Sequence, residues 1–143
     1  MSKQIDARGP RFGAAVTSVV LGAALIIGEG AVATALVVLQ AIAFGLGTLV
    51  GPQAQPYGRF FSRFVAPRLA PATEFEDPRP PRFAQGVGLG FASAALLGIA
   101  LGSVALAQAA LAFALAAALL NAVFGVCLGC ELYLLGRRLA PAR

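Results

Sequence analysis

The chain alternates long apolar stretches with short polar segments, and this pattern predicts its architecture. Four apolar stretches cover residues 12–28, 31–50, 83–101 and 104–135. Each approaches or exceeds the roughly 20 residues that a helix needs to cross a hydrocarbon core. Helices are expected because a membrane-spanning segment must satisfy its own backbone hydrogen bonds. Only two or three residues separate the members of each pair, so the pattern predicts two tandem helical hairpins.

The composition supports lipid as the surrounding solvent. Of the 143 residues, 59% are hydrophobic and 12% are charged, and the mean hydropathy is +0.83. A soluble protein of this length has too little interior volume to hide so much apolar surface. We therefore expect an all-α integral membrane protein whose residues 1–143 form a single membrane domain.

The positions of the basic residues predict the orientation in the membrane. All eleven lie in three segments: before the first span, between the second and third spans, and after the fourth, where they are Lys3, Arg8, Arg11, Arg59, Arg63, Arg68, Arg79, Arg82, Arg137, Arg138 and Arg143. Four spans bring these segments to one face, and the positive-inside rule makes that face cytoplasmic. The net charge of +5 thus reports topology, not nucleic-acid binding. Both termini are expected in the cytoplasm and the spans in the inner (plasma) membrane.

An alternative interpretation treats the N-terminus as a signal peptide. The basic residues 3–11 would be its head, residues 13–27 its apolar core and residues 31–33 its cleavage site. This alternative would leave residues 31–50 as a lone first span.

An internal repeat favours the four-span interpretation. The motif DxRxPRF occurs at residues 6–12 and again at 77–83, and RLAPA occurs at 68–72 and again at 138–142. The nearly equal offsets, 71 and 70 positions, indicate a duplicated two-span unit, with repeat 1 at about 6–72 and repeat 2 at about 77–142. Chance similarity remains an alternative, because the middles of the halves align poorly.

The polar segment between the hairpins contains an amphipathic pattern. Aromatic residues recur at helical spacing on one side and arginines lie on the other, giving the set Tyr57, Arg59, Phe60, Phe61, Arg63 and Phe64. This pattern is typical of a cytoplasmic helix that lies in the membrane interface and contacts lipid. A helix that packs on the bundle without a lipid role is equally compatible with the pattern.

Few polar residues lie within the apolar stretches. Gln40, Gln108 and Asn121 are uncharged, and such residues usually hydrogen-bond helices to one another. Small residues recur every four positions in the third and fourth stretches, which favours a close hairpin or a dimer interface.

The segment whose side chains could take part in a reaction is GVCLGCE, residues 125–131. On a helix, Cys127 and Cys130 share a face, with Cα atoms near the roughly 5–6 Å that a disulfide requires. We expect the pair near the C-terminal, cytoplasmic end of the last span. There the helix dipole and Glu131, a possible modulator, would both disfavour a thiolate. Two packed, unreactive cysteines are the alternative.

Other chemistry has little support in this composition. The chain has no histidine, and two sulfurs alone leave a zinc ion half coordinated. The segment also lacks the histidine that follows the cysteines in a c-type haem site. We expect no metal and no cofactor.

Three segments together resemble a known bacterial family. These are DxRGPRF at residues 6–12, PRFAQGVG at 81–88 and NAVFGVCLGCE at 121–131. They resemble the uncharacterised membrane family known as domain of unknown function 4395, over almost the whole chain. The resemblance implies a multi-span protein of a type frequent in actinobacteria, with genes associated with those of sulfurtransferases and thioredoxin-like proteins.

These observations lead to three functional hypotheses. The first is a membrane thiol component that uses Cys127 and Cys130 to exchange electrons or sulfane sulfur with a cytoplasmic thioredoxin-like or rhodanese-like (sulfurtransferase) partner. The second is a permease or channel for a small sulfur compound. The third is a non-enzymatic accessory or scaffold subunit of a membrane complex, with a homodimer as a further possibility; whether the protein is an enzyme is left open.

Overall fold

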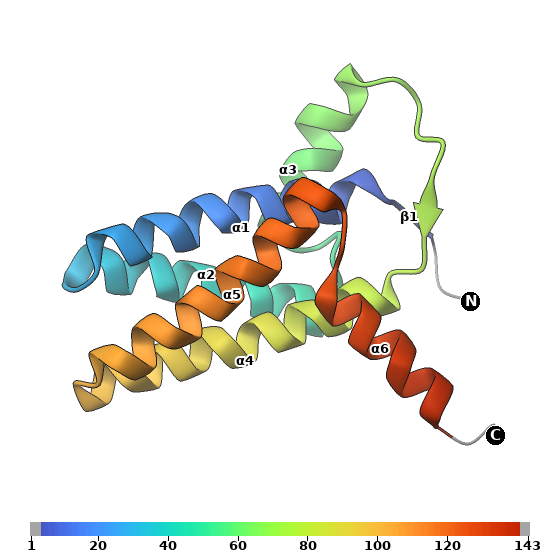
Figure 1. Ribbon diagram of the computed structural model, residues 1–143. Coiled ribbons are helices and arrows are strands. Elements are labelled where there is room, and N and C mark those ends of the chain that lie inside the picture. The colour runs from blue at the N-terminus through green and yellow to red at the C-terminus, as the bar shows by residue number, and fades with distance from the viewer. Residues whose placement is uncertain (1–3, 141–143) are drawn as a thin grey trace.

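Four long helices dominate the computed structural model, which describes residues 4–140 (Figure 1). They are α1 (Arg8–Ile27), α2 (Ala31–Leu49), α4 (Arg79–Leu101) and α5 (Val104–Phe124). Each is long and apolar enough to cross a membrane. The four predicted spans are therefore confirmed as helices, and the fourth is shorter than expected because α5 ends at Phe124. The basic residues Lys3 and Arg143 lie outside the described residues, as do Pro141 and Ala142 at the end of the second RLAPA motif.

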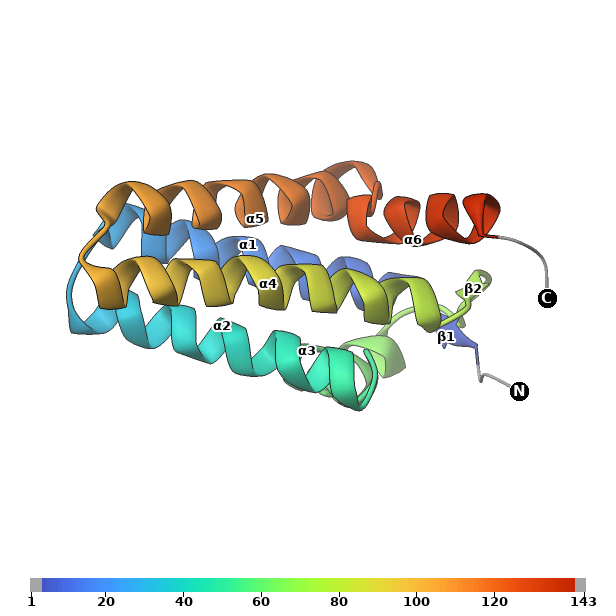
Figure 2. The ribbon, with the colours of Figure 1, turned by 90° about the horizontal axis from the view of Figure 1, so that it is seen from below.

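Shorter elements gather at one end of the bundle, beside both ends of the described chain (Figures 1 and 2). They are β1 (Ile5–Asp6), α3 (Pro56–Phe60), a π-helical turn (Phe61–Val65), a 3-10 turn (Ala66–Arg68), β2 (Phe75–Glu76) and α6 (Leu128–Leu139). β1 and β2 form a two-stranded antiparallel pair. The all-helical expectation thus holds apart from this short pair, and we call this end of the molecule the basic end.

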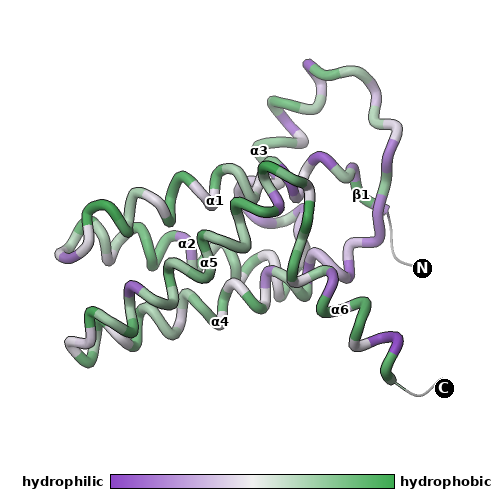
Figure 3. The backbone as a smooth tube through the Cα atoms, viewed as in Figure 1, coloured by the Kyte–Doolittle hydropathy of each residue, from purple (hydrophilic) through white to green (hydrophobic). Residues whose placement is uncertain are grey.

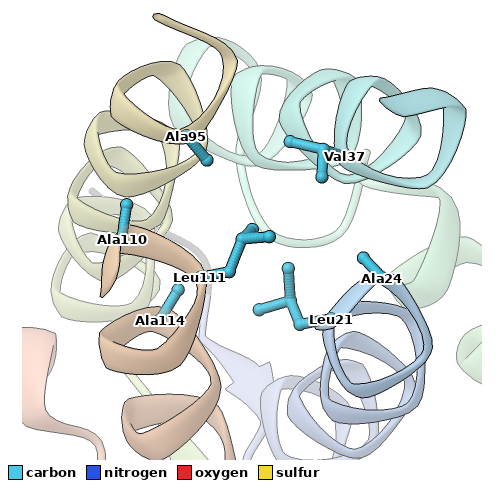
Figure 4. Close-up of a cluster of buried hydrophobic side chains, with 7 residues drawn as sticks. All are labelled: Leu21, Ala24, Val37, Ala95, Ala110, Leu111 and Ala114. Carbon is cyan, nitrogen blue, oxygen red and sulfur yellow. The ribbon is translucent and has the colours of Figure 1, made fainter. Parts of the chain in front are cut away.

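The long helices form a four-membered bundle. Helix α1 packs against α2 and α5, and α4 packs against the same two helices. Seven buried side chains from all four helices meet between them (Figure 4): Leu21, Ala24, Val37, Ala95, Ala110, Leu111 and Ala114. Most of this core is alanine, so the helices are held close by small side chains and dispersion contacts.

The outer surface of the bundle is apolar. Only 17% to 33% of each hydrophobic window is buried inside the protein, and large side chains such as Ile26, Ile42 and Phe113 are exposed. Hydrophobic residues follow the long helices, while hydrophilic ones concentrate at the basic end (Figure 3). Such a surface is stable in lipid and not in water, as expected of a multi-pass membrane protein.

Residues 71 positions apart make equivalent contacts. Asp6 accepts hydrogen bonds from the backbone and side chain of Arg8, and Asp77 does the same with Arg79. Arg11 donates to the last carbonyl groups of α5, whereas Arg82 donates to the last carbonyl groups of α2. Each of these arginines satisfies helix-terminal acceptors that have no partner within their own helix.

Glycines set how closely some helices approach. A Cβ atom on Gly98 would lie 2.7 Å from the backbone nitrogen of Ala107, so the α4–α5 hairpin is tight near its turn. A Cβ on Gly88 would lie 2.6 Å from the ring of Phe44 on α2. Gly98 belongs to the four-residue spacing of small residues in α4 and faces α5, whereas Gly88 lies outside that spacing and faces α2.

Candidate functional site

The cysteine segment begins where α5 ends. Gly125 adopts φ 71°, and its N–H donates to the carbonyl of Asn121 while the N–H of Val126 donates to that of Leu120. This is the glycine-dependent pattern that terminates many helices. The expectation of one continuous helix over residues 104–135 was wrong, because a residue without a side chain takes the left-handed conformation at Gly125 and ends the helix.

Cys127 then begins a new helix. Its backbone is extended, and its Sγ accepts a hydrogen bond of 3.3 Å from the backbone N–H of Cys130. Cys127 is thus the N-cap residue of α6, a position usually taken by serine, threonine or aspartate. The two cysteines form a disulfide with a Cα–Cα distance of 5.2 Å. Their spacing predicted this proximity.

At this location the helix dipole has the opposite effect on the cysteines from the one predicted. The sequence places the pair near a helix C-terminus, where the dipole disfavours negative charge on sulfur. It lies instead at the N-terminus of α6, where unpaired N–H groups and the dipole favour negative charge. Glu131 is exposed in the first turn of the same helix. Its carboxylate still opposes a nearby thiolate, so the modulating role expected of it remains a prediction.

Gly129 docks the start of α6 against α4. It is buried, and a Cβ there would lie 2.6 Å from Cα of Ala84. Only glycine at position 129, between the two cysteines in the sequence, permits α6 to approach α4 this closely. Because Arg11 of α1 binds the end of α5 and α6 packs on α4, residues 125–127 lead from the α1 side of the bundle to the α4 side, as Figure 1 shows. The disulfide lies at the end of this crossing.

A cavity of about 270 Å³ lies beside the disulfide. Its walls come from all four long helices and α6, and they include Cys127. Most lining residues are apolar, and the polar ones are Thr17, Gln85 and Asn121. Phe91 and Phe113 stack at one side, with ring centroids 6.2 Å apart. Phe113 is 65% exposed, so this side of the cavity reaches the lipid-facing surface.

Amide and hydroxyl groups form a buried network next to the cavity. Gln40 is fully buried; its amide donates to Thr17, and its carbonyl accepts from the hydroxyl of Tyr57 at 2.9 Å. Burial raises the pKa of Tyr57 above its ordinary value. Nearby, Gln55 donates to Gln85 at 2.8 Å. The prediction that Gln40 hydrogen-bonds helices together is confirmed; its partner Tyr57 was missed, because the aromatic spacing alone assigned that ring to lipid.

The expected lipid-contacting residues divide into two groups. Tyr57 turns inward to Gln40, and Phe61 is buried at 4% exposure against Phe12 of α1. The remaining four are exposed: Arg59, Phe60, Arg63 and Phe64. The segment therefore packs on the bundle through one side and leaves an aromatic and basic side outward.

The remaining polar residues of the spans lie apart. Gln108 donates to the carbonyl of Gly28 at 3.4 Å and joins the two hairpin turns at the end of the bundle opposite the basic end. Asn121 lies in the last turn of α5 and lines the cavity with Cys127. Of the three uncharged residues singled out, only Asn121 thus lies with a cysteine.

Comparison with known proteins places the chain in a family without giving it an activity. No curated protein and no solved structure gives a significant match. The profile of one family matches residues 5–138, nearly the whole chain. The chain belongs to the family described as Domain of unknown function (DUF4395).

Proposed function

We propose that this protein is a membrane thiol–disulfide component that exchanges electrons, or sulfane sulfur, with a thioredoxin-like or rhodanese-like partner in the cytoplasm. The observation that carries the proposal is the Cys127–Cys130 disulfide at the N-terminus of α6. Both cysteines are partly exposed, so a partner thiol can approach them. The N–H that Cys130 donates to Sγ of Cys127 stabilises negative charge on that sulfur when the disulfide opens.

The exchange reaction needs only two dithiols. A partner thiolate attacks one sulfur of the disulfide, forms a mixed disulfide and releases the other sulfur as a thiolate. The partner's second thiol then displaces the chain, which leaves the partner oxidised and Cys127 and Cys130 reduced. In the sulfur-transfer version, a thiolate of the chain takes the outer sulfur of a partner persulfide, and the partner returns to a thiol.

The location in the cell follows from the charge distribution. The described arginines belong to the basic end, which also carries α3, α6 and both ends of the described chain (Figures 1 and 3). With the positive-inside rule, this end faces the cytoplasm, and the disulfide lies at the cytoplasmic boundary of the membrane. Arg59, Phe60, Arg63 and Phe64 then contact headgroups and the acyl boundary.

The equivalent contacts of the two halves support an internal duplication. Ile5 of β1 pairs with Glu76 of β2, and Glu76 is the residue that corresponds to Ile5 in the second repeat, 71 positions later. Residues 56–68 and α6 also correspond at this offset, and each packs on the first helix of its own half. The proposed unit is therefore a hairpin followed by a short helix. Its second copy carries the cysteines where the first copy has Pro56 and Arg59.

Mixed-disulfide trapping tests the proposal. The purified full chain is reconstituted in lipid nanodiscs with its disulfide intact and is incubated with a thioredoxin that lacks its resolving cysteine. A covalent adduct that dithiothreitol releases is expected. Cys127→Ser with Cys130→Ser is the matched control and should give none. Absence of any adduct with thioredoxin-like or rhodanese-like proteins, in either redox state of the chain, would contradict the proposal.

A further inference from the structure

We propose that the cavity beside Cys127 binds the ring of a lipid-soluble quinone, and that this quinone oxidises the Cys127–Cys130 dithiol. The inference rests on the proposed function, because it names the electron acceptor for the same pair of cysteines. It requires that the cavity fit such a ring, that a ring can enter from lipid, and that the reaction balance.

The size and lining of the cavity fit a quinone ring. Its volume, about 270 Å³, is close to the lower end of the range of roughly 300–1,000 Å³ for small-molecule sites. That suffices for a headgroup whose isoprenoid tail remains in lipid. The cavity lining includes no aspartate, glutamate, lysine or arginine, so it favours an uncharged ligand over an anion or a cation.

The three polar lining residues supply donors for quinone carbonyl groups. The amide of Asn121 lies in the last turn of α5, in the same cavity wall as Cys127. Gln85 accepts a hydrogen bond through its carbonyl from Gln55, which leaves its N–H groups to donate. Thr17 accepts from Gln40 and keeps its hydroxyl hydrogen. A few donors in an apolar cavity fix the orientation of such a ligand.

The entrance faces the lipid, where a quinone is dissolved. Phe91 and Phe113 form the side between α4 and α5, and Phe113 is largely exposed on the outside of the bundle. Aromatic rings at this position can stack on an incoming ring. A water-soluble oxidant does not dissolve in the hydrocarbon region, so it cannot reach an entrance that faces the lipid.

The reaction balances without another ionisable group. Two S–H bonds break and one S–S bond forms between Cys127 and Cys130, which releases two electrons and two protons. The quinone takes both and becomes a quinol. Cys127 lines the cavity, whereas Cys130, one helical turn further along, is partly exposed outside it. We therefore assign the contact with quinone to Cys127 and the contact with the protein partner to Cys130.

The test measures oxidation of the reduced chain by ubiquinone-1 in nanodiscs without oxygen. This quinone has no unsubstituted ring position, so thiols cannot add to it. Wild-type protein should form one disulfide per quinol produced. Ala118→Leu, which places a larger side chain on the cavity wall, should lower the rate of oxidation at least about tenfold. Ala116→Leu is the matched control, because Ala116 is exposed on the same helix and absent from the cavity lining.

Two further measurements separate the possible failures. Asn121→Leu should also slow oxidation by quinone, and thermal unfolding in the same nanodiscs checks that each variant is folded. Binding of radiolabelled ubiquinone-1 to the Cys127→Ser, Cys130→Ser variant should be saturable and weakened by Ala118→Leu.

A chain that exchanges with thioredoxin but neither binds nor reacts with ubiquinone-1 would overturn this inference and leave the proposed function standing. Equal rates for Ala118→Leu, Asn121→Leu and wild type would overturn it as well. A dithiol inert to both partners would overturn the proposed function.

Discussion

The guanidinium of Arg11 donates a hydrogen bond of 3.1 Å to the carbonyl oxygen of Ala122, 111 residues further along the chain. A second bond, 2.9 Å long, reaches Val123. The N-terminal part of α1 thereby fixes the point where α5 ends and the cysteine segment begins. Arg82 makes the corresponding bonds to the end of α2, beside the entry to residues 56–68.

The first prediction concerns these two arginines. Arg11→Ala and Arg82→Ala should each lower the free energy of unfolding by about 1–3 kcal/mol, because each leaves two helix-terminal carbonyl groups without a charged donor. Thermal unfolding in mild detergent measures the change. Arg59→Ala is the control, since Arg59 is exposed like Arg11 and Arg82 but its side chain donates no hydrogen bond to another described residue, so the change should affect stability little. Equal stability of all three variants would remove the assigned role.

The sequence predicted the four long apolar helices well, because hydropathy acts locally. All four span boundaries at the hairpin turns agree with the helices to within one residue, and the nearness of Cys127 and Cys130 followed from their spacing alone. The largest difference is at the end of the last span, where α5 ends at Phe124. Gly125 lies in a run that is apolar on both sides, so hydropathy does not show that the helix ends there. The glycine that follows Phe124 was the signal in the sequence that could have indicated this helix end.

Contacts between distant segments were beyond the reach of the sequence. The Tyr57–Gln40 hydrogen bond depends on how residues 56–68 fold back onto the bundle, which helical spacing does not determine. The cavity depends on α6 docking on α4 while the end of α5 is bound by Arg11 of α1, and residues 125–127 make this change of direction. Charge and hydropathy identified the basic end, while the arrangement of side chains there needed the structure.

The second prediction contrasts two glycines of α4. Gly88→Ala should destabilise the bundle by about 1–3 kcal/mol, because the new methyl group collides with the buried ring of Phe44. Gly90→Ala has no atom within 4 Å of its Cβ and should be neutral or slightly stabilising, by up to about 1 kcal/mol. Unfolding by heat in one detergent compares the pair. If both variants behave alike, the α2–α4 contact is looser than described.

The third prediction concerns the buried network. Gln40→Leu and Tyr57→Phe should each cost about 1–3 kcal/mol, because each leaves a buried polar group unpaired. The double variant should cost clearly less than the sum, since the partners disappear together. A double-mutant cycle on unfolding free energies measures this coupling. Additive losses would mean that the two side chains do not interact.

The fourth prediction is a pH dependence at the basic end. The guanidinium of Arg8 lowers the pKa of Asp6, and that of Arg79 lowers the pKa of Asp77, in each case chiefly through a side-chain hydrogen bond. These carboxylates therefore stabilise the fold above their unfolded pKa, and the contribution is lost as pH falls through their lower folded values. Hydrogen exchange of the Ala7 amide, which donates to Glu74, should accelerate, relative to the intrinsic rate, in that acidic range. Asp6→Asn should abolish most of the dependence.

Glu76 provides the opposite sign in the same pair of strands. Burial raises the pKa of Glu76 above its ordinary value, so ionisation of Glu76 costs stability as pH rises through its folded pKa. Glu76→Gln should therefore stabilise the protein at neutral pH, and the gain should vanish below about pH 4, where the wild-type residue is also protonated. A gain that is independent of pH would contradict this assignment.

The most direct test of a cytoplasmic thiol–disulfide site is the labelling of Cys127 and Cys130 in oriented membrane vesicles. Inside-out and right-side-out vesicles are treated with a membrane-impermeant maleimide, before and after reduction. We predict no labelling before reduction, and labelling after reduction only where the cytoplasmic face is outward. Free thiols before reduction, or labelling from the opposite face, would contradict the account.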